Sequence, residues 1–151
     1  MHLIQNTSEV YQRSYVRFED LPDTDNTRIM VLRVAQEDGT FIANTGLQKN
    51  STAYYWVIRV SGQTQQNYTT TVSADTWNEM EFYFNATTNG NATLWVNGTK
   101  IGEMTGDFSG VGNLARVYPY IFIGDGNQVS AKTVYHDNYR VVLNIEVHFT
   151  S

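Results

Sequence analysis

Hydrophobic and polar residues alternate along most of the chain, which is the pattern of half-buried β-strands. In residues 77–85, for example, Met80, Phe82 and Phe84 fall on one face of an extended segment and polar residues on the other. Many further short segments rich in β-branched and aromatic residues follow this pattern, and no window carries a helical stripe. The pattern predicts an all-β protein.

Turn residues separate the expected strands at short intervals, as in Asp38-Gly39, Ser61-Gly62 and Asn97-Gly98. Asn97-Gly98 predicts a tight hairpin, because both residues tolerate the positive φ of a type I′ turn. No helix-length segment lies between the strands, and no linker is recognisable. We therefore expect one domain over residues 1–151, built as a two-sheet antiparallel β-sandwich of the jelly-roll type.

Alternation also assigns faces to individual strands. Segment 28–34 is apolar on both sides, which predicts a strand buried on both faces, one with Ile29, Val31 and Arg33 and the other with Met30, Leu32 and Val34. In residues 53–60 the more apolar face carries Tyr54, Trp56, Ile58 and Val60 and is expected in the core. In residues 116–124 we expect Pro119 to interrupt the strand ladder by a bulge or an edge position.

The opposite faces of these segments supply the candidate binding residues. Aromatic rings stack on the apolar faces of sugars, and a guanidinium can bind hydroxyls or a uronate carboxylate. The sequence thus predicts a carbohydrate-binding groove lined by Tyr55, Arg59, Tyr118 and Tyr120. The alternative is that these aromatic residues form cross-strand pairs with a structural role only.

Composition and charge exclude several classes of protein. The net charge is −5 and the ten Lys and Arg are scattered, which makes nucleic acid an unfavourable partner. The chain has no Cys, so disulfides, thiolate metal sites and cysteine nucleophiles are excluded. No apolar run is long enough for a membrane helix, and the first ten residues lack the features of a signal peptide.

Triplets of the form Asn-x-Ser/Thr are more frequent than composition alone predicts. Such triplets are typical of exported glycoproteins, which favours an extracellular or cell-surface location. Alternatively, Asn and Thr are simply common in turns and exposed strands, and Asn97 is explained by its hairpin. The candidate glycosylation sites are Asn6, Asn50, Asn67, Asn85, Asn91 and Asn97.

Four motifs in order carry a family resemblance: a strand opened by Trp77, the hairpin of residues 94–98, the strand ending in Ile123-Gly124, and the pair Asp137-Asn138. In this order they resemble the concanavalin A-like lectin and glucanase superfamily, with its laminin-G-like domains. The resemblance spans residues 67–143 and implies a jelly roll. Because that scaffold hosts lectins, binding modules, hydrolases, lyases and structural modules, it implies no single activity.

Catalytic motifs of that superfamily are not found in the sequence. The glucanase motif Glu-x-Asp-x-x-Glu is absent, and no combination matches the Tyr-lysine strand motif with separate Arg, Gln and His of the alginate-lyase branch. Glu79 and Glu81, two residues apart on one strand face, have a spacing that permits retaining glycoside hydrolysis, but they also fit a solvated strand face. The three histidines show no metal-binding spacing, and His136 and Asp137 point to opposite faces, which argues against a catalytic triad.

A structural Ca²⁺ is a further expectation. In calcium-binding members of the superfamily a closing-strand Asp ligates Ca²⁺, and the resemblance places Asp137 at that position. Oxygen ligands suit this hard cation, and the possible partners are Glu9, Glu19 and Asp20. Asp125 and Asn127 form a second candidate. The alternative is that Asp137 and Asn138 bond their own backbone in a cap or bulge.

Three functional hypotheses follow. The first is a non-catalytic carbohydrate-binding or adhesive module, a lectin-like partner of a polysaccharide or glycan, in a secreted or cell-surface protein. The second is a structural subunit of a surface layer or filament, in which an extra strand within residues 141–151 self-associates with a neighbour's edge strand. The third is a polysaccharide hydrolase or lyase. The missing catalytic motifs make a binding module the preferred interpretation over an enzyme.

Overall fold

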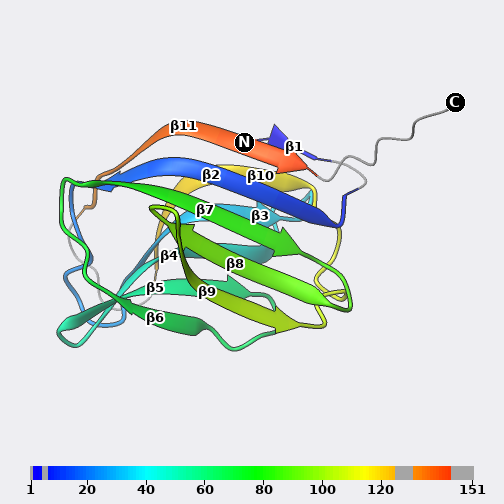
Figure 1. Cartoon of the computed structure of the whole chain (residues 1–151), viewed down its shortest axis with the longest axis horizontal. Coiled ribbons are helices and arrows are strands. Elements are labelled where there is room, and N and C mark those ends of the chain that lie inside the picture. Colours follow the sequence, from blue (N-terminus) through cyan, green and yellow to red (C-terminus); the bar gives the residue numbers. More distant parts are fainter. Residues whose placement is uncertain (1, 5–6, 125–130, 144–151) are drawn as a thin grey trace, which may run out of the picture.

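A computed structural model describes residues 2–4, 7–124 and 131–143 of the chain (Figure 1). The described part is built of strands alone, which confirms the all-β prediction. The strands are β1 (His2–Leu3), β2 (Glu9–Phe18), β3 (Arg28–Ala35), β4 (Phe41–Asn50), β5 (Ala53–Val60), β6 (Gln66–Thr70), β7 (Trp77–Asn85), β8 (Gly90–Val96), β9 (Thr99–Gly106), β10 (Arg116–Gly124) and β11 (Val134–Leu143).

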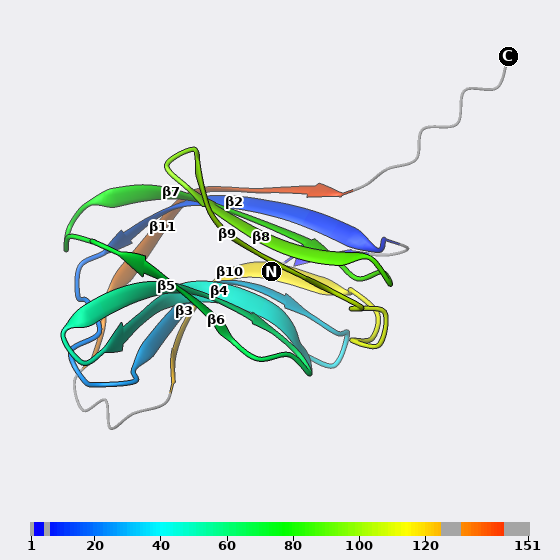
Figure 2. The same cartoon turned by 60° about the horizontal axis from the view of Figure 1, so that its bottom comes forward.

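The strands form two antiparallel sheets that pack face to face. Sheet A has six strands in the order β1-β10-β3-β4-β5-β6, and sheet B has five in the order β11-β2-β7-β8-β9. Figure 2 shows the two layers, with β2, β7 and β8 above β3, β4 and β5. The predicted two-sheet jelly-roll sandwich is therefore confirmed.

The core lies between the sheets and follows the alternation of the sequence. Met80, Phe82 and Phe84 of β7 are fully buried, and Phe84 stacks on Phe108 with ring centroids 5.8 Å apart. Tyr54, Trp56, Ile58 and Val60 of β5 contact the same core cluster, as predicted. Each fully buried large apolar side chain contributes about 1.5–3 kcal/mol by removing apolar surface from water. The hydrophobic effect thus fixes which face of each strand points outward.

The β8–β9 hairpin forms at the predicted turn. Asn97 and Gly98 have φ values of 53° and 79°, as a type I′ turn requires. The Asn97 side chain also accepts a hydrogen bond of 2.9 Å from the backbone N–H of Glu79 in β7. Asn97 therefore has a structural role that explains its place in the sequence.

Strand β3 confirms one prediction and corrects another. Residues 29–32 are fully buried, as expected for a strand covered on both faces. However, Ile29, Val31 and Leu32 all contact the core cluster, whereas Arg33 lies over outer-face tyrosine rings. The cause is a bulge between Met30 and Leu32 in the β3–β4 ladder, which shifts the alternation by one residue.

The described residues contain no helix long and apolar enough to span a membrane. The strand-donation hypothesis depends on residues 141–151, of which 141–143 end β11 and 144–151 lie outside the described part of the chain. So do Asn6, Asp125 and Asn127.

Candidate functional site

The outer face of sheet A carries polar and aromatic residues in rows that run across the strands. One row consists of residues directly opposite each other in the ladders of β10, β3, β4 and β5: Tyr118, Arg33, Asn44 and Arg59. A second row, displaced along the same strands, consists of Arg28, Gln48, Tyr55 and Thr69 in β3, β4, β5 and β6. We call the surface formed by Arg28, Arg33, Arg59, Tyr55, Tyr118, Tyr120, Asn44 and Gln48 the arginine–tyrosine face.

Between these rows lies a floor of small and apolar residues. Met30, Gly46 and Val57 are opposite each other in β3, β4 and β5. Met30 and Val57 are fully buried but do not belong to the core cluster, so longer side chains of the face cover them. Gly46 leaves no room for a side chain, since a Cβ atom would lie 2.2 Å from the carbonyl oxygen of Ile29. The β3 bulge and Gly46 together shape this floor.

Tyr120 is the most enclosed aromatic residue of the face. It lies in β10 between Pro119 and Phe122, where the register with β3 shifts, as predicted for Pro119. Its ring stands edge-on to Tyr118 at 5.5 Å and stacks on Phe122 at 6.5 Å. The side-chain amide of Asn44 donates a hydrogen bond of 2.7 Å to the Tyr120 hydroxyl.

The electrostatic surroundings of the Tyr120 hydroxyl are cationic. Burial raises the pKa of Tyr120, while the hydrogen bond from Asn44 and the charges of Arg33 and Arg59 act in the opposite direction. The Asn44 amide is itself buried, with 2% exposure, and its Oδ1 has no hydrogen-bond partner among the described residues. A buried acceptor therefore lies beside the hydroxyl.

Two of the three arginines of the face, Arg33 and Arg59, lie over aromatic rings. Arg33 donates a hydrogen bond of 2.7 Å to the carbonyl of Gly39 and lies over Tyr120, with its guanidinium carbon 5.6 Å from the ring centroid. The guanidinium carbon of Arg59 lies over Phe41, 5.0 Å from the ring centroid. Arg28 donates to the Gln65 side chain. Burial, and then the charge of Arg59, lower the pKa of Arg28, so the face concentrates positive charge.

The two sheets differ sharply in charge. Within their described strands, sheet A contains no Asp or Glu but carries Arg28, Arg33, Lys49, Arg59 and Arg116. All strand carboxylates lie in sheet B, at Glu9, Glu79, Glu81, Glu103 and Asp137. Although the chain is acidic as a whole, the described strands of sheet A therefore carry positive charge only.

The structure places all four sequence-predicted binding residues, Tyr55, Arg59, Tyr118 and Tyr120, on this one face. Tyr118, Tyr120 and Arg59 lie near each other, whereas Tyr55 belongs to the second row. Sequence reasoning missed Arg28, Arg33, Asn44 and Gln48. One signal in the sequence was a charged residue, Arg33, inside an otherwise apolar strand. Strict alternation assigns Arg33 to the wrong face, because it does not take the β3 bulge into account.

Sheet B places Glu79 and Glu81 among tyrosines. Tyr15 donates a hydrogen bond of 2.8 Å to Glu79, Tyr11 donates to Glu81, and Tyr83 donates to Glu9. Hydrogen bonding with Glu81 and Tyr15 lowers the pKa of Glu79. A glycosidase general acid needs a raised pKa instead. Glu79 and Glu81 therefore fit a network of cross-strand hydrogen bonds better than a catalytic pair.

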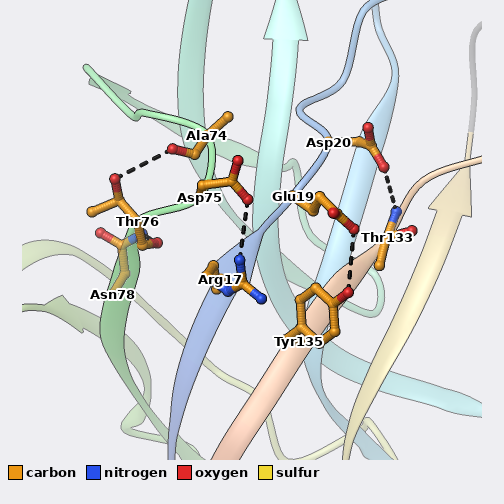
Figure 3. A network of polar contacts seen from close by, with 9 residues as sticks. All are labelled: Arg17, Glu19, Asp20, Ala74, Asp75, Thr76, Asn78, Thr133 and Tyr135. Atoms are coloured by element: carbon orange, nitrogen blue, oxygen red, sulfur yellow. Dashed lines mark hydrogen bonds and ion pairs between the residues drawn. The ribbon is translucent and has the colours of Figure 1, made fainter.

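The proposed calcium partners of Asp137 do not come together. Figure 3 shows Glu19 beside the Tyr135 hydroxyl and Asp20 beside the backbone N–H of Thr133, at 3.3 and 2.9 Å. Asp137 lies opposite Tyr15 in the middle of β2, and Glu9 begins that strand. Among the described residues no group of three or more His, Asp or Glu is arranged to hold a metal. Calcium at Asp137 stays a prediction.

His136 and Asp137 point to opposite sides of β11, as predicted. Asp137 is exposed, whereas His136 faces the interior, where its Nδ1 lies 2.9 Å from the hydroxyl of Ser14. Ser14 is fully buried and the other ring nitrogen of His136 contacts the carbonyl of Tyr120 at 3.1 Å. No carboxylate orients the ring, so this contact is not a catalytic triad.

Of the candidate glycosylation sites within the described residues, Asn67 and Asn97 are exposed and Asn50, Asn85 and Asn91 are half-buried. Asn91 accepts a hydrogen bond from Thr93, and Asn97 is engaged by its turn. Asn67 lies opposite Val57, on the arginine–tyrosine face itself.

Comparisons with known proteins identify the fold. No protein-family model matches the chain, and no curated protein matches it. Among solved structures, an alginate lyase, Aly36B, in complex with alginate tetrasaccharide is 14% identical with a TM-score of 0.63, covering 97% of this chain and 74% of that one. The cellulose induced protein Cip1 is 16% identical with a TM-score of 0.56, covering 91% and 68%.

A pentraxin from Limulus polyphemus is 10% identical with a TM-score of 0.52, covering 95% of this chain and 86% of that one. At these identities the similarity shows a shared jelly-roll fold and no more.

Proposed function

We propose that the protein is a non-catalytic carbohydrate-binding module that holds an acidic polysaccharide on the arginine–tyrosine face. The observation that carries this proposal is the charge division between the sheets: Arg28, Arg33 and Arg59 share a surface on which the described strands have no carboxylate. Guanidinium groups bind uronate carboxylates in forked hydrogen bonds, and the tyrosine rings offer stacking area to pyranose rings.

The state of the arginines supports an anionic ligand over a neutral one. Burial and then the charge of Arg59 lower the pKa of Arg28, which means that the two cations repel each other. A bound carboxylate relieves this repulsion, whereas a neutral sugar does not. The structural relatives that act on alginate or respond to cellulose agree with a carbohydrate ligand, but at their low identity they support the fold only.

The direct test is binding of the purified protein to alginate, polygalacturonate, cellulose and mannan, followed by calorimetry. We expect binding to the two polyuronates and none to the two neutral polymers. Arg59→Ala should weaken polyuronate binding about tenfold or more, because a charge-assisted hydrogen bond contributes about 1.5–3 kcal/mol. Arg13→Ala on sheet B is the matched control. Equal binding to neutral polymers, or equal effects of the two variants, contradicts the proposal.

A polysaccharide lyase is the second candidate, because Tyr120 stands between Arg33, Arg59 and Asn44. In such a reaction the proton beside the uronate carboxyl leaves, the glycosidic C–O bond breaks, and a C=C bond forms in the sugar. The raised pKa of Tyr120 suits proton donation to the departing oxygen. However, the described outer side chains of sheet A include no His, Lys, Asp or Glu to serve as base, which ranks this candidate second.

Lyase activity is tested by incubating the protein with alginate or polygalacturonate and following ultraviolet absorbance of the unsaturated product. Absorbance that rises with wild type but not with Tyr120→Phe would replace the binding-module proposal by the lyase. No rise, together with binding, supports the binding module.

We also propose that the protein is exported or displayed at a cell surface, where such polymers are found. The intact mass of the protein from its native source tests this through its glycans. Asn67 lies on the proposed binding face, so we expect it to carry none even if other candidate sites are occupied. A glycan on Asn67 contradicts the binding face, and a native protein without any glycan contradicts this route to the export proposal.

A further inference from the structure

Two polar side chains interrupt the apolar inner stripe of β2. Along this strand Val10, Val16 and Phe18 point into the core, but between them Gln12 and Ser14 are also fully buried. Burying a polar group is unfavourable unless it finds a hydrogen-bond partner, and an apolar side chain would fill the same space at no such cost. Stability alone therefore does not explain these two residues.

Each of the two begins a chain of hydrogen bonds that crosses the sandwich. The Tyr139 hydroxyl in β11 donates to Gln12 Oε1 at 2.7 Å, and Gln12 Nε2 donates to the carbonyl of Arg33 in β3 at 3.3 Å. Ser14 contacts His136 Nδ1 at 2.9 Å, and His136 Nε2 contacts the carbonyl of Tyr120 in β10 at 3.1 Å. Both chains thus start in sheet B and end on the backbone of sheet A.

The chemistry of these contacts sets the state of His136. A carbonyl accepts only, so His136 Nε2 carries the proton and donates to Tyr120. In the neutral ring Nδ1 is then an acceptor for the Ser14 hydroxyl. This contact also reaches a backbone carbonyl in the irregular part of β10, where the register with β3 passes from Pro119 to Phe122 without a partner for Tyr120. His136 therefore donates to the Tyr120 carbonyl at the point where the register of the β10–β3 ladder is interrupted.

Both carbonyls belong to residues whose side chains form the arginine–tyrosine face. We propose that His136 and Gln12 are positioning residues, which hold the backbone at Tyr120 and Arg33 from inside the sandwich and thereby fix the phenol and the guanidinium on the outside. The proposal rests on the proposed function for its affinity readout, but not for its structural one. Hydrogen bonds of this kind keep the polar groups of a binding site in one geometry before the ligand binds.

Paired variants separate positioning from stability. Gln12→Leu removes the acceptor of the hydrogen bond from the Tyr139 hydroxyl and destabilises the core, whereas Gln12→Leu/Tyr139→Phe removes both side chains of that bond and should recover much of the thermal stability. Because the carbonyl of Arg33 still lacks the hydrogen bond from Gln12, the double variant should keep the weakened polyuronate affinity, about fivefold below wild type. Recovery of affinity together with stability would overturn the proposal.

His136 offers a second pair. His136→Leu removes the donor to Tyr120, while His136→Gln retains an amide donor, so affinity for alginate should fall about fivefold in the first and less in the second. Phe84→Leu, a core variant at the Phe108 contact away from Tyr120 and Arg33, controls for general destabilisation and should leave affinity unchanged. If Phe84→Leu weakens binding as much as His136→Leu, the positioning role is refuted.

A readout without ligand distinguishes this inference from the proposed function. In ¹³C-tyrosine NMR, with the Tyr120 signal assigned by Tyr120→Phe, we expect His136→Leu to bring the raised pKa of Tyr120 towards the ordinary tyrosine value. If wild type binds no polysaccharide but this change occurs, the proposed function fails and the positioning role stands. An unchanged Tyr120 signal in His136→Leu overturns the positioning role regardless of binding.

Discussion

The outer faces of the two sheets contain the same kinds of residue but use them differently. On sheet B, Tyr11, Tyr15 and Tyr83 donate to carboxylates, and Arg17 pairs with Asp75 at 3.1 Å (Figure 3). On sheet A, Arg33 lies over two tyrosine rings and donates to the carbonyl of Gly39, and Arg59 lies over Phe41. The strands of one sheet carry charges of both signs, and those of the other carry positive charge without a described strand carboxylate. A surface of the second kind gains more from an external anion.

The comparison is tested most strongly by reversing charges on each face. Arg28→Glu/Arg59→Glu should lower polyuronate affinity by about a hundredfold or more, because two charge-assisted contacts become repulsive. The matched variant Arg13→Glu/Arg140→Glu changes two opposed arginines of β2 and β11 on sheet B, and should change affinity less than about twofold. Calorimetry with alginate measures both. Similar losses in the two variants would show that the bound polymer does not distinguish the faces.

The backbone beneath the arginine–tyrosine face gives the next largest effect. A Cβ atom at Gly46 would lie 2.2 Å from the Ile29 oxygen and 2.6 Å from Met30 Cα, both backbone atoms that cannot rotate away. Gly46→Ala should therefore reduce the free energy of unfolding by about 3 kcal/mol, at the upper end for overpacking. Gly110→Ala is the control, because no heavy atom lies within 4 Å of its Cβ position. Urea unfolding measures both variants, and equal stability of the two would show that β3 lacks the close approach to Gly46.

The salt dependence of polyuronate affinity should give a smaller effect. Raising NaCl from about 0.05 M to about 0.5 M screens exposed charges, so polyuronate affinity should fall about tenfold. Arg59→Ala should show a shallower dependence, because it has one cation fewer on the binding face. An affinity that does not change with salt would favour stacking on Tyr55, Tyr118 and Tyr120 as the main contribution.

The sequence predicts the layers of this fold better than it predicts the site. Alternation in β7 and the Asn97-Gly98 turn depend on local rules, and both predictions are confirmed. The arginine–tyrosine face depends on which strands become neighbours: β10 lies beside β3, far from it in sequence, and brings Tyr118 opposite Arg33. The bulge at Met30 then reverses the expected orientation of Arg33. Pairing between distant strands and a single-residue shift are not encoded in any local pattern.

The same limit applies to the interior. Gln12, Ser14, His136 and Tyr139 show no motif, because their link exists only after β11 pairs with β2 and the two sheets pack. Sequence alternation places His136 and Asp137 on opposite sides of a strand, but it cannot identify the carbonyl of Tyr120 as the partner of His136.

Acidification gives the smallest expected effect, a loss of stability through His136, which lies between the sheets and not on an outer face. Burial lowers the pKa of His136, and the hydrogen bond to the carbonyl of Tyr120 acts in the opposite direction. The described partners of the ring, Ser14 and that carbonyl, are neutral. In the unfolded chain His136 therefore binds a proton near the ordinary histidine pKa, about 6.5. In the folded chain it binds the proton only at a lower pH. Stability due to His136 is present above that pH and is lost as the pH falls below it.

Urea unfolding at about pH 7.5 and about pH 5.5 should thus show a loss of stability in wild type that is smaller in His136→Gln, since the window lies above the ordinary carboxyl pKa values. The lowered carboxyl pKa values, such as those of Glu79 and Glu103, add their own loss only at more acid pH, and they do so equally in both proteins. An identical pH dependence in wild type and His136→Gln would show that His136 is not held neutral between the sheets.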